Sequence, residues 1–259
     1  MKNTFVFDLD GTLIHGNQIK LDDYALKSLE LAKNYGEIII ASARPLFGIK
    51  FLLPDKLNIT KLIALNGALI FNKNHIRLKH QLEFAQLNDT IRKLTSSFED
   101  IWVFTENEWF VSSKMTDHYK KESFIISTEA KELSELTINE QILKIIIISD
   151  KSKNEICGYL GKDLLSKISV VKSNSNYWEI NSKGVNKYVA IKDLCSTGNR
   201  IIAFGDSDND VCFLKNAYFS STVSNATTEV KNIATYVANA SYSKGVFESM
   251  NNIINLMRY

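Results

Sequence analysis

Short apolar runs recur along the chain, and most are apolar at every position rather than at alternate positions. Five of them are "TFVF" (4–7), "EIIIAS" (37–42), "KLIALNG" (61–67), "RIIAFGD" (200–206) and "ATYVANA" (234–240). Continuous runs of this length, rich in β-branched residues, are typical of strands that are buried on both faces. The pattern therefore predicts a parallel sheet.

A segment with helical spacing separates the first two runs. Residues 21–36 read "LDDYALKSLELAKNYG", and their small and apolar positions Ala25, Leu26, Leu29 and Ala32 recur every three or four residues. Asp22 or Asp23 can cap the start, and Gly36 follows the last turn. Strand, helix and strand at this spacing form a βαβ unit, so we expect an α/β fold with a doubly wound or similar sheet.

The middle of the chain has a different pattern, which predicts a second, α+β domain at 82–183, inserted into a first domain made of 1–81 and 184–259. Two alternating strands at 101–113 flank a turn at Glu106 and Asn107. Helices are expected at 83–98, 128–136 and 151–161, and further strands at 142–149, 167–173 and 176–181.

Composition narrows the class of protein. The chain has 259 residues, 45% of them hydrophobic, and a net charge of +2, so no strong field favours nucleic acid or a membrane surface. Its three cysteines form no C-x-x-C pair, which favours a reducing cytoplasm. No apolar segment is long enough for a membrane span, and the first one is too short for a signal peptide. We expect a soluble intracellular protein.

Small or acidic residues stand where the predicted strands end. The runs stop at Asp8, at Ser42-Ala43-Arg44, at Asn66-Gly67 and at Gly205–Asp210. In an open α/β sheet the ligand crevice lies beyond the carboxyl ends of the strands, so these segments are expected to meet there. Asp10-Gly11 between apolar runs equally favours a β-hairpin when taken alone. A hairpin explains only its own segment, so we predict a buried strand that enters a catalytic loop.

Three of these carboxylates predict a metal site if they are neighbours. Two carboxylates about 4 Å apart repel by about 4 kcal/mol at an effective dielectric constant of about 20, unless a cation separates them. Oxygen ligands suit Mg²⁺, so we expect Asp8, Asp10 and Asp206 to bind it. Asp8 can act as nucleophile towards phosphorus and Asp10 as general acid and base. Thr12 is expected to orient Asp10.

Other residues complete a phosphate site in this hypothesis. Gly11 lets the backbone approach the phosphate, Ser42 offers a hydroxyl to it, and Lys187 neutralises charge in the transition state. Taken singly, Ser42 is typical of a loop and Lys187 of a solvated surface. The Gly205–Asp210 segment also mimics part of a calcium loop, but that loop needs Gly and Glu where Val211 and Ala217 stand. Trp109, Phe110, Tyr177 and Trp178 fit packing of the inserted domain better than contact with a substrate.

Together the segments resemble four motifs of the haloacid dehalogenase superfamily. They are "DLDGT" (8–12), Ser42 in "IIIASARP", Lys187 in "GVNK" and "GDSDND" (205–210). The large insert, "NGA" (66–68) and "SNA" (224–226) resemble its Cof-type subgroup, which has a C2B cap domain. The second motif of the family is usually Thr-Gly-Arg, and here it is Ser42-Ala43-Arg44. The hydroxyl is kept, and the methyl group of Ala43 is expected to cost little.

The resemblance implies a Rossmann-like core, Mg²⁺ and hydrolysis of phosphomonoesters through a phosphoaspartate. It assigns the nucleophile to Asp8, the general acid and base to Asp10, and the metal to Asp8, Asp206 and the backbone carbonyl of Asp10. The implied phosphate contacts are Gly11, Ser42, Ala43, Lys187 and Asn209, and Thr12 and Asp210 support them. Asp210 is expected to orient Lys187 or a metal-bound water.

We therefore predict a cytoplasmic, Mg²⁺-dependent phosphatase that acts on a small phosphorylated metabolite, such as a sugar phosphate or a phosphorylated cofactor. We expect neither nucleic acid nor membrane as a partner. One alternative is a phosphomutase or phosphotransferase, which would pass the phosphate to an alcohol instead of water. A second is a non-catalytic module that is phosphorylated on Asp8, although a general base such as Asp10 would give a stable phosphoaspartate no advantage.

Overall fold

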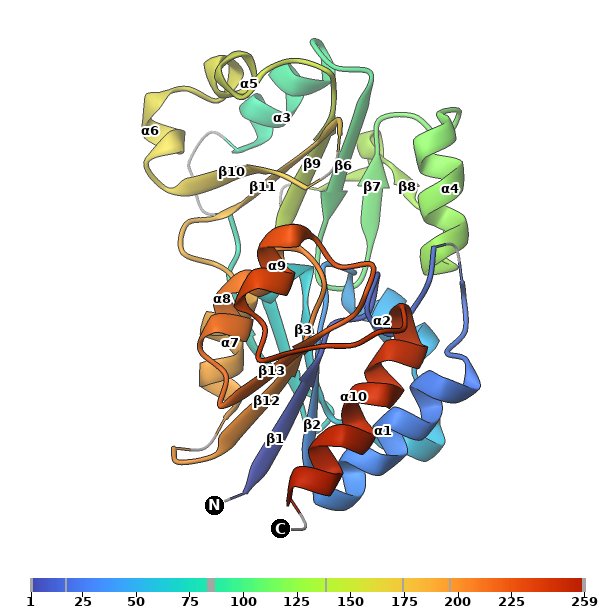
Figure 1. Ribbon diagram of the computed structural model, residues 1–259. Coiled ribbons are helices and arrows are strands. Elements are labelled where there is room, and N and C mark those ends of the chain that lie inside the picture. Colours follow the sequence, from blue (N-terminus) through green and yellow to red (C-terminus); the bar gives the residue numbers. More distant parts are fainter. Residues whose placement is uncertain are drawn as a thin grey trace.

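Two sheets, one above the other, organise the protein in the computed structural model (Figure 1). The structure describes residues 2–16, 18–82, 87–137, 139–173, 175–195 and 197–257. The lower sheet has eight strands and the upper one has six. The predicted α/β fold with a parallel-sheet core is confirmed.

The lower sheet has the strand order β14-β13-β12-β1-β2-β3-β4-β5. Its strands are β1 (Asn3–Phe7), β2 (Gly36–Ala41), β3 (Lys61–Ala64), β4 (Leu69–Asn72), β5 (His75–Lys79), β12 (Arg200–Phe204), β13 (Phe219–Thr222) and β14 (Tyr236–Val237). The pairs from β14 to β3 are parallel, and β4 and β5 add two antiparallel strands at the edge. Strands β1 and β12 are central, so the residues that follow them lie in the middle of one sheet edge.

Helices cover both sides of this sheet. They are α1 (Asp23–Tyr35), α2 (Leu46–Leu52), α7 (Lys187–Leu194), α8 (Val211–Lys215), α9 (Thr228–Ile233) and α10 (Tyr242–Met257), with short 3₁₀ turns η1 (Asp55–Leu57), η2 (Leu65–Gly67) and η4 (Asp208–Asp210). Helices α1 and α10 lie side by side on one side of the sheet, and α7 and α8 lie on the other (Figure 1). The side chain of Asp22 accepts a hydrogen bond from the Ala25 amide, so the predicted cap of α1 is present.

The first strand is not one arm of a hairpin. Strand β1 pairs in parallel with both β2 and β12, and the rings of Phe7 and Phe204 stack with centroids 4.6 Å apart. Beyond the strand, the amides of Leu13 and Ile14 both donate to the carbonyl of Leu9, which closes a compact loop. The interpretation as a buried strand followed by a loop is confirmed, because pairing on both edges leaves no place for a returning arm.

The upper sheet has the order β10-β11-β9-β6-β7-β8. Its strands are β6 (Asp100–Phe104), β7 (Trp109–Val111), β8 (Lys131–Glu132), β9 (Lys144–Ile148), β10 (Ile168–Lys172) and β11 (Tyr177–Ser182). Its other elements are α3 (Leu87–Thr95), α4 (Asp117–Ile126), η3 (Leu133–Glu135), α5 (Lys153–Leu160) and α6 (Lys162–Leu165). We refer to this sheet and its helices as the cap.

The two faces of the cap sheet belong to different hydrophobic clusters. In β9, Ile145 and Ile147 pack into a cluster under α3 and α5, whereas Ile146 and Ile148 join the core that continues into the lower sheet. In β6, Trp102 shares the second face. Because side chains of a strand alternate between faces, one face of the cap sheet is directed at the lower sheet.

The prediction of a helix at 128–136 is wrong. No α-helix forms at 128–136, where β8 pairs in parallel with β7 and the short 3₁₀ turn η3 follows. Helix α4 instead precedes this segment, and the Thr116 side chain caps it by accepting from the Tyr119 amide. Strand pairing outweighs the helix-forming residues of 128–136. The sequence of helix α4 has no clear repeat of apolar residues every three or four positions, because only Tyr119 and Ile126 are buried in it.

Strands of the lower sheet come from 3–79 and 200–237, and those of the cap from 100–182. The domain boundaries at 81/82 and 183/184 stay a prediction, as does the start of the helix expected at 83–98, since 83–86 lie outside the described residues. Within the described part of the chain, no helix is both long and apolar enough to cross a membrane.

Candidate active site

A buried lysine joins two of the predicted aspartates. Asp8 directly follows β1, and Lys187 is the first residue of α7. Its Nζ lies 2.6 Å from Asp8 Oδ1 and 2.7 Å from Asp210 Oδ1. The Lys187 side chain is only 1% exposed. A lysine that is unremarkable in sequence is therefore the central cation of this cluster, and Asp210 is in direct contact with it.

Asp206 lies against the loop that follows β1. A Cβ atom on Gly11 would lie 2.2 Å from Asp206 Oδ2, and Gly11 has a φ of +90°, so a larger residue would both clash and be strained. The hydroxyl of Thr12 donates to Asp206 Oδ1 at 2.8 Å, instead of orienting Asp10 as expected. The Asn225 side chain of the "SNA" segment donates to the Gly11 carbonyl at 2.8 Å and fixes the loop from the other side.

The carboxylates fit a divalent cation. Asp8, Asp206 and Asp210 each offer an oxygen, and these oxygens lie within 4.8 Å of one another. Asp8 Oδ2 is buried and has no hydrogen-bond partner among the described residues. Buried carboxylate oxygens of this kind suit a hard cation such as Mg²⁺. The side chain of Asp10 is not in this group, so any metal contact from Asp10 falls to its backbone carbonyl.

Burial and mutual repulsion raise the pKa values of two acidic groups at this site. Burial raises the pKa of Asp8 well above its usual range, although Lys187 acts in the opposite direction. Burial and the charge of Asp210 raise the pKa of Asp206 to about 6. A divalent cation would favour the ionised forms of both carboxyls.

The side chain of Asp10 is held by Arg44, which our candidate residues did not include. Arg44 Nε and Nη2 donate to the two carboxylate oxygens of Asp10 at 2.7 and 2.6 Å. Arg44 Nη1 also donates to the carbonyl of Ile125 in α4, at 2.9 Å. One arginine thus connects the loop after β2, the loop after β1 and the cap. Its place two residues after Ser42, at a strand end, was the available signal in the sequence.

Ser42 and Asn209 both form hydrogen bonds with Asn66. Ser42 is buried, its Oγ accepts from the Arg44 amide at 3.1 Å, and its carbonyl accepts from the Asn66 amide at 3.0 Å. Asn209 Nδ2 donates to Asn66 Oδ1 at 3.2 Å. The segment after β12 is itself rigid, because Asp210 Oδ2 accepts from the backbone amide of Asp206 at 3.0 Å. The predicted phosphate contacts Ser42 and Asn209 are therefore both linked to Asn66, one through the backbone and the other through side chains.

A cavity of about 420 Å³ opens between the lower sheet and the cap, beside these residues. From below it is lined by Asp8, Asp10, Ala43, Arg44 and Asn209, and from the cap by Trp102, Phe104, Lys144, Tyr177 and Glu179. Of the four aromatic residues considered in the sequence, Tyr177 lines this cavity. Trp109 belongs to the core shared by both sheets, whereas Phe110 and Trp178 pack on the far face of the cap sheet.

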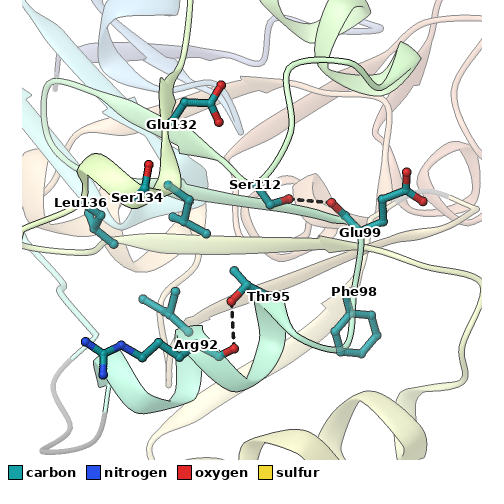
Figure 2. Close-up of a pocket in the computed structure, with 10 residues that line it drawn as sticks. Arg92, Thr95, Phe98, Glu99, Ser112, Glu132, Ser134 and Leu136 are labelled. Carbon is teal, nitrogen blue, oxygen red and sulfur yellow. Dashed lines mark hydrogen bonds between the residues drawn. The ribbon is translucent and has the colours of Figure 1, made fainter.

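A larger cavity, of about 630 Å³, lies on that far face (Figure 2). Two of its hydroxyl groups bind the backbone, since Thr95 Oγ1 donates to the Arg92 carbonyl at 2.8 Å and Ser112 Oγ to the Glu99 carbonyl at 2.7 Å. The guanidinium of Arg92 points away from the other labelled side chains (Figure 2). Convergent charged groups, not cavity size, therefore distinguish the site beside Asp8.

Comparison with known proteins agrees with this geometry. Residues 5–250 match the family described as haloacid dehalogenase-like hydrolase. The chain is 25% identical over 256 residues to 5-amino-6-(5-phospho-D-ribitylamino)uracil phosphatase of Bacillus subtilis, covering 94% of this chain and 92% of that protein. It is 27% identical over 266 residues to phosphoglycolate phosphatase of Nitrosopumilus maritimus, covering 99% and 98%.

A solved haloacid dehalogenase-like hydrolase from Bacteroides thetaiotaomicron has the same fold, with a TM-score of 0.84 at 22% identity over 98% of this chain and 100% of that one. The prediction of an enzyme that hydrolyses phosphoric monoesters is confirmed by the family and by these phosphatase relatives. The chain belongs to the haloacid dehalogenase-like hydrolase family.

Proposed function

We propose that this chain is a Mg²⁺-dependent phosphatase of the cytoplasm that hydrolyses phosphomonoesters of small metabolites through an aspartyl-phosphate. The observation that carries the proposal is the buried Lys187 between Asp8 and Asp210, beside an Asp8 oxygen without a described partner. That arrangement offers a nucleophile and a fixed positive charge at one point of a cavity. Magnesium, held by Asp8, Asp206 and the Asp10 carbonyl, would offset the charge between the carboxylate and the phosphate dianion.

The first step forms a bond between an Asp8 oxygen and phosphorus and breaks the bond to the leaving oxygen. Asp10 gives its proton to that oxygen, so the leaving group departs as an alcohol. Lys187 stabilises the charge on the phosphoryl oxygens. Asp210 keeps Lys187 in place by its 2.7 Å contact.

The second step frees Asp8. Asp10 takes a proton from water, and the water oxygen bonds to phosphorus while the bond to Asp8 breaks, which releases inorganic phosphate. The bidentate contact of Arg44 holds both carboxylate oxygens of Asp10 in a fixed orientation beside Asp8. Ser42 and Asn209 would hold the phosphoryl group through both steps, with Gly11 and Ala43 leaving room for it.

The test is release of inorganic phosphate from p-nitrophenyl phosphate with and without Mg²⁺, followed by a panel of phosphorylated metabolites. The relatives named for a ribitylamino-uracil phosphate and for phosphoglycolate make sugar phosphates, phosphorylated cofactor precursors and small phosphorylated acids the first compounds to try. Asp8→Asn is expected to abolish release. Activity that survives this change would remove Asp8 as nucleophile, and transfer to an added alcohol without release would indicate a phosphotransferase.

A further inference from the structure

A buried ion pair stands in the cap wall of the active-site cavity. Lys144 Nζ lies 2.8 Å from Glu179 Oε2, and the two side chains are only 2% and 8% exposed. Lys144 begins β9, and Glu179 lies in β11 opposite Ile146. Lys144 and Glu179 are therefore diagonal neighbours on the face of the cap sheet that is directed at Asp8.

Stability alone does not explain this pair. Removing two charges from water costs about as much as their attraction returns, and apolar residues of similar size often serve equally well. The neighbours on this face show the apolar alternative, since Trp102, Phe104 and Ile146 fill it. A charged pair kept among these side chains, in the wall of a cavity, points to a contact with a ligand.

Asn66 fixes the pair relative to the catalytic loops. Its Nδ2 donates to Glu179 Oε2 at 3.1 Å, its Oδ1 accepts from Asn209 at 3.2 Å, and its amide donates to the Ser42 carbonyl at 3.0 Å. Asn66 has a φ of 57°, a conformation that asparagine tolerates better than most residues. Glu179 and Lys144 are thus held at a fixed place above the phosphate end of the cavity, where the leaving group must lie.

Lys144 and Glu179 can form hydrogen bonds with the hydroxyl groups of a ligand in the cavity. The Lys144 ammonium has three N–H donors, and Glu179 takes one of them. A hydroxyl of a ligand can accept from Lys144 and donate to Glu179 at once, whereas a carboxylate would meet the Glu179 charge. The cap side of the cavity carries two lysines and two glutamates, Lys121, Lys144, Glu122 and Glu179, so it offers no excess of positive charge to an anion.

We infer that the Lys144–Glu179 pair selects the leaving group, and that it favours one with hydroxyl groups over one with a carboxylate. The inference rests on the proposed phosphatase function. Trp102 and Phe104 would pack against the C–H face of such a polyol. The pair acts on binding and not on the chemistry at phosphorus, so its removal should change the choice of substrate more than the reaction itself.

The experiment compares kcat/KM for the best sugar or polyol phosphate, for p-nitrophenyl phosphate and for phosphoglycolate. Lys144→Met/Glu179→Leu removes both charges and is expected to fold, which thermal unfolding checks. Loss of hydrogen bonds to charged groups should lower the ratio of polyol ester to aryl ester by about tenfold or more. Glu108→Gln, which breaks the Lys131–Glu108 ion pair elsewhere in the cap, should leave that ratio unchanged.

The outcomes separate this inference from the phosphatase proposal. Wild-type protein that hydrolyses none of the esters overturns both. An active wild type that prefers phosphoglycolate to every polyol phosphate overturns the inference alone. So does a folded double variant with an unchanged ratio, or one in which all substrates lose activity equally.

Discussion

Lys187 Nζ lies 2.6 Å from Asp8 Oδ1, although the two residues are 179 positions apart in the chain. The contact is buried and is shared with Asp210 at 2.7 Å. Both carboxylates raise the pKa of Lys187 against the effect of burial, so the lysine keeps its charge. A permanent cation between two aspartates is the feature on which both the stability and the proposed chemistry of the site depend.

Lys187→Met should lower both the stability of the protein and its phosphatase activity. Removal of the cation leaves Asp8 and Asp210 buried without a compensating positive charge, which is expected to cost about 3–5 kcal/mol in the free energy of unfolding. Added Mg²⁺ should restore part of it, because a divalent cation can replace the lost charge. Phosphatase activity should fall by about 10²–10³-fold. Urea unfolding with and without Mg²⁺, together with phosphate release, measures these effects.

Lys192→Met is the matched control for that change, since Lys192 is an exposed lysine of the same helix. It should alter neither stability nor activity appreciably. A Lys187→Met protein as active as wild type would contradict the assigned role.

Asp10→Asn should slow the reaction according to the leaving group. Asparagine cannot transfer a proton, so kcat for an alkyl phosphate should fall by about 10²–10⁴-fold. An aryl phosphate with an acidic phenol needs little protonation and should lose less in formation of the phosphoenzyme. Rapid-quench measurement of both substrates tests this, and an equal loss in that step would argue against Asp10 as the general acid.

Gly11→Ala should weaken Mg²⁺ binding. The new methyl group would lie 2.2 Å from Asp206 Oδ2, so Asp206 must move. Displacement of a metal ligand is expected to lower Mg²⁺ affinity by about tenfold or more. Isothermal titration with Mg²⁺ and thermal unfolding report affinity and stability separately.

Gly198→Ala is the control that separates the backbone strain of Gly11→Ala from its displacement of Asp206. Gly198 has a φ of +88°, close to the +90° of Gly11, but a Cβ atom there meets nothing within 4 Å. Both variants should lose about 1–2 kcal/mol from backbone strain. If both also bound Mg²⁺ like the wild type, the contact between Gly11 and Asp206 would have no role in the metal site.

Lys144→Met should make stability depend on pH in a defined direction. Burial raises the pKa of Glu179. The charge of Lys144 and hydrogen bonds from Lys144, Ser173 and Asn66 lower it by more than burial raises it, so the pKa of Glu179 lies below its usual value. The ionised pair therefore contributes stability above the unfolded-state pKa, and the contribution is lost as the pH falls through the lower folded-state pKa.

Without Lys144, burial should raise the pKa of Glu179 above its usual range. The variant would then be about 3–5 kcal/mol less stable than wild type at pH 7. The difference should narrow as the pH falls through that raised pKa, because Glu179 in the folded variant then becomes protonated. Denaturant unfolding at several pH values checks this. Lys144→Met/Glu179→Leu has no carboxyl to protonate, so a gap with the same pH dependence in this variant would refute the explanation.

Local pattern was enough for much of the lower sheet. The runs before Asp8 and before Asp206 are apolar at every position, which a strand buried on both faces requires whatever its neighbours are. Once those strands were taken as parallel, their carboxyl ends had to share an edge, and Asp8 and Asp206 do lie there. The chemistry of phosphoryl transfer required a cation, and Lys187 was the candidate, but nothing in its own segment distinguishes it from a surface lysine. The resemblance then supported that choice.

The sequence by itself determined the central buried strands, the family and the residues that stand at the ends of those strands, because these depend on spacing along the chain. Only the tertiary structure decided which partner each side chain binds. Thr12 donates a hydrogen bond to Asp206, and Arg44 donates to Asp10. It also decided which face of "KIIII" (144–148) lines the cavity, since a run without alternation does not distinguish its two faces. Register with β6 and β11 places Lys144 on that face, and register is a property of the assembled sheet.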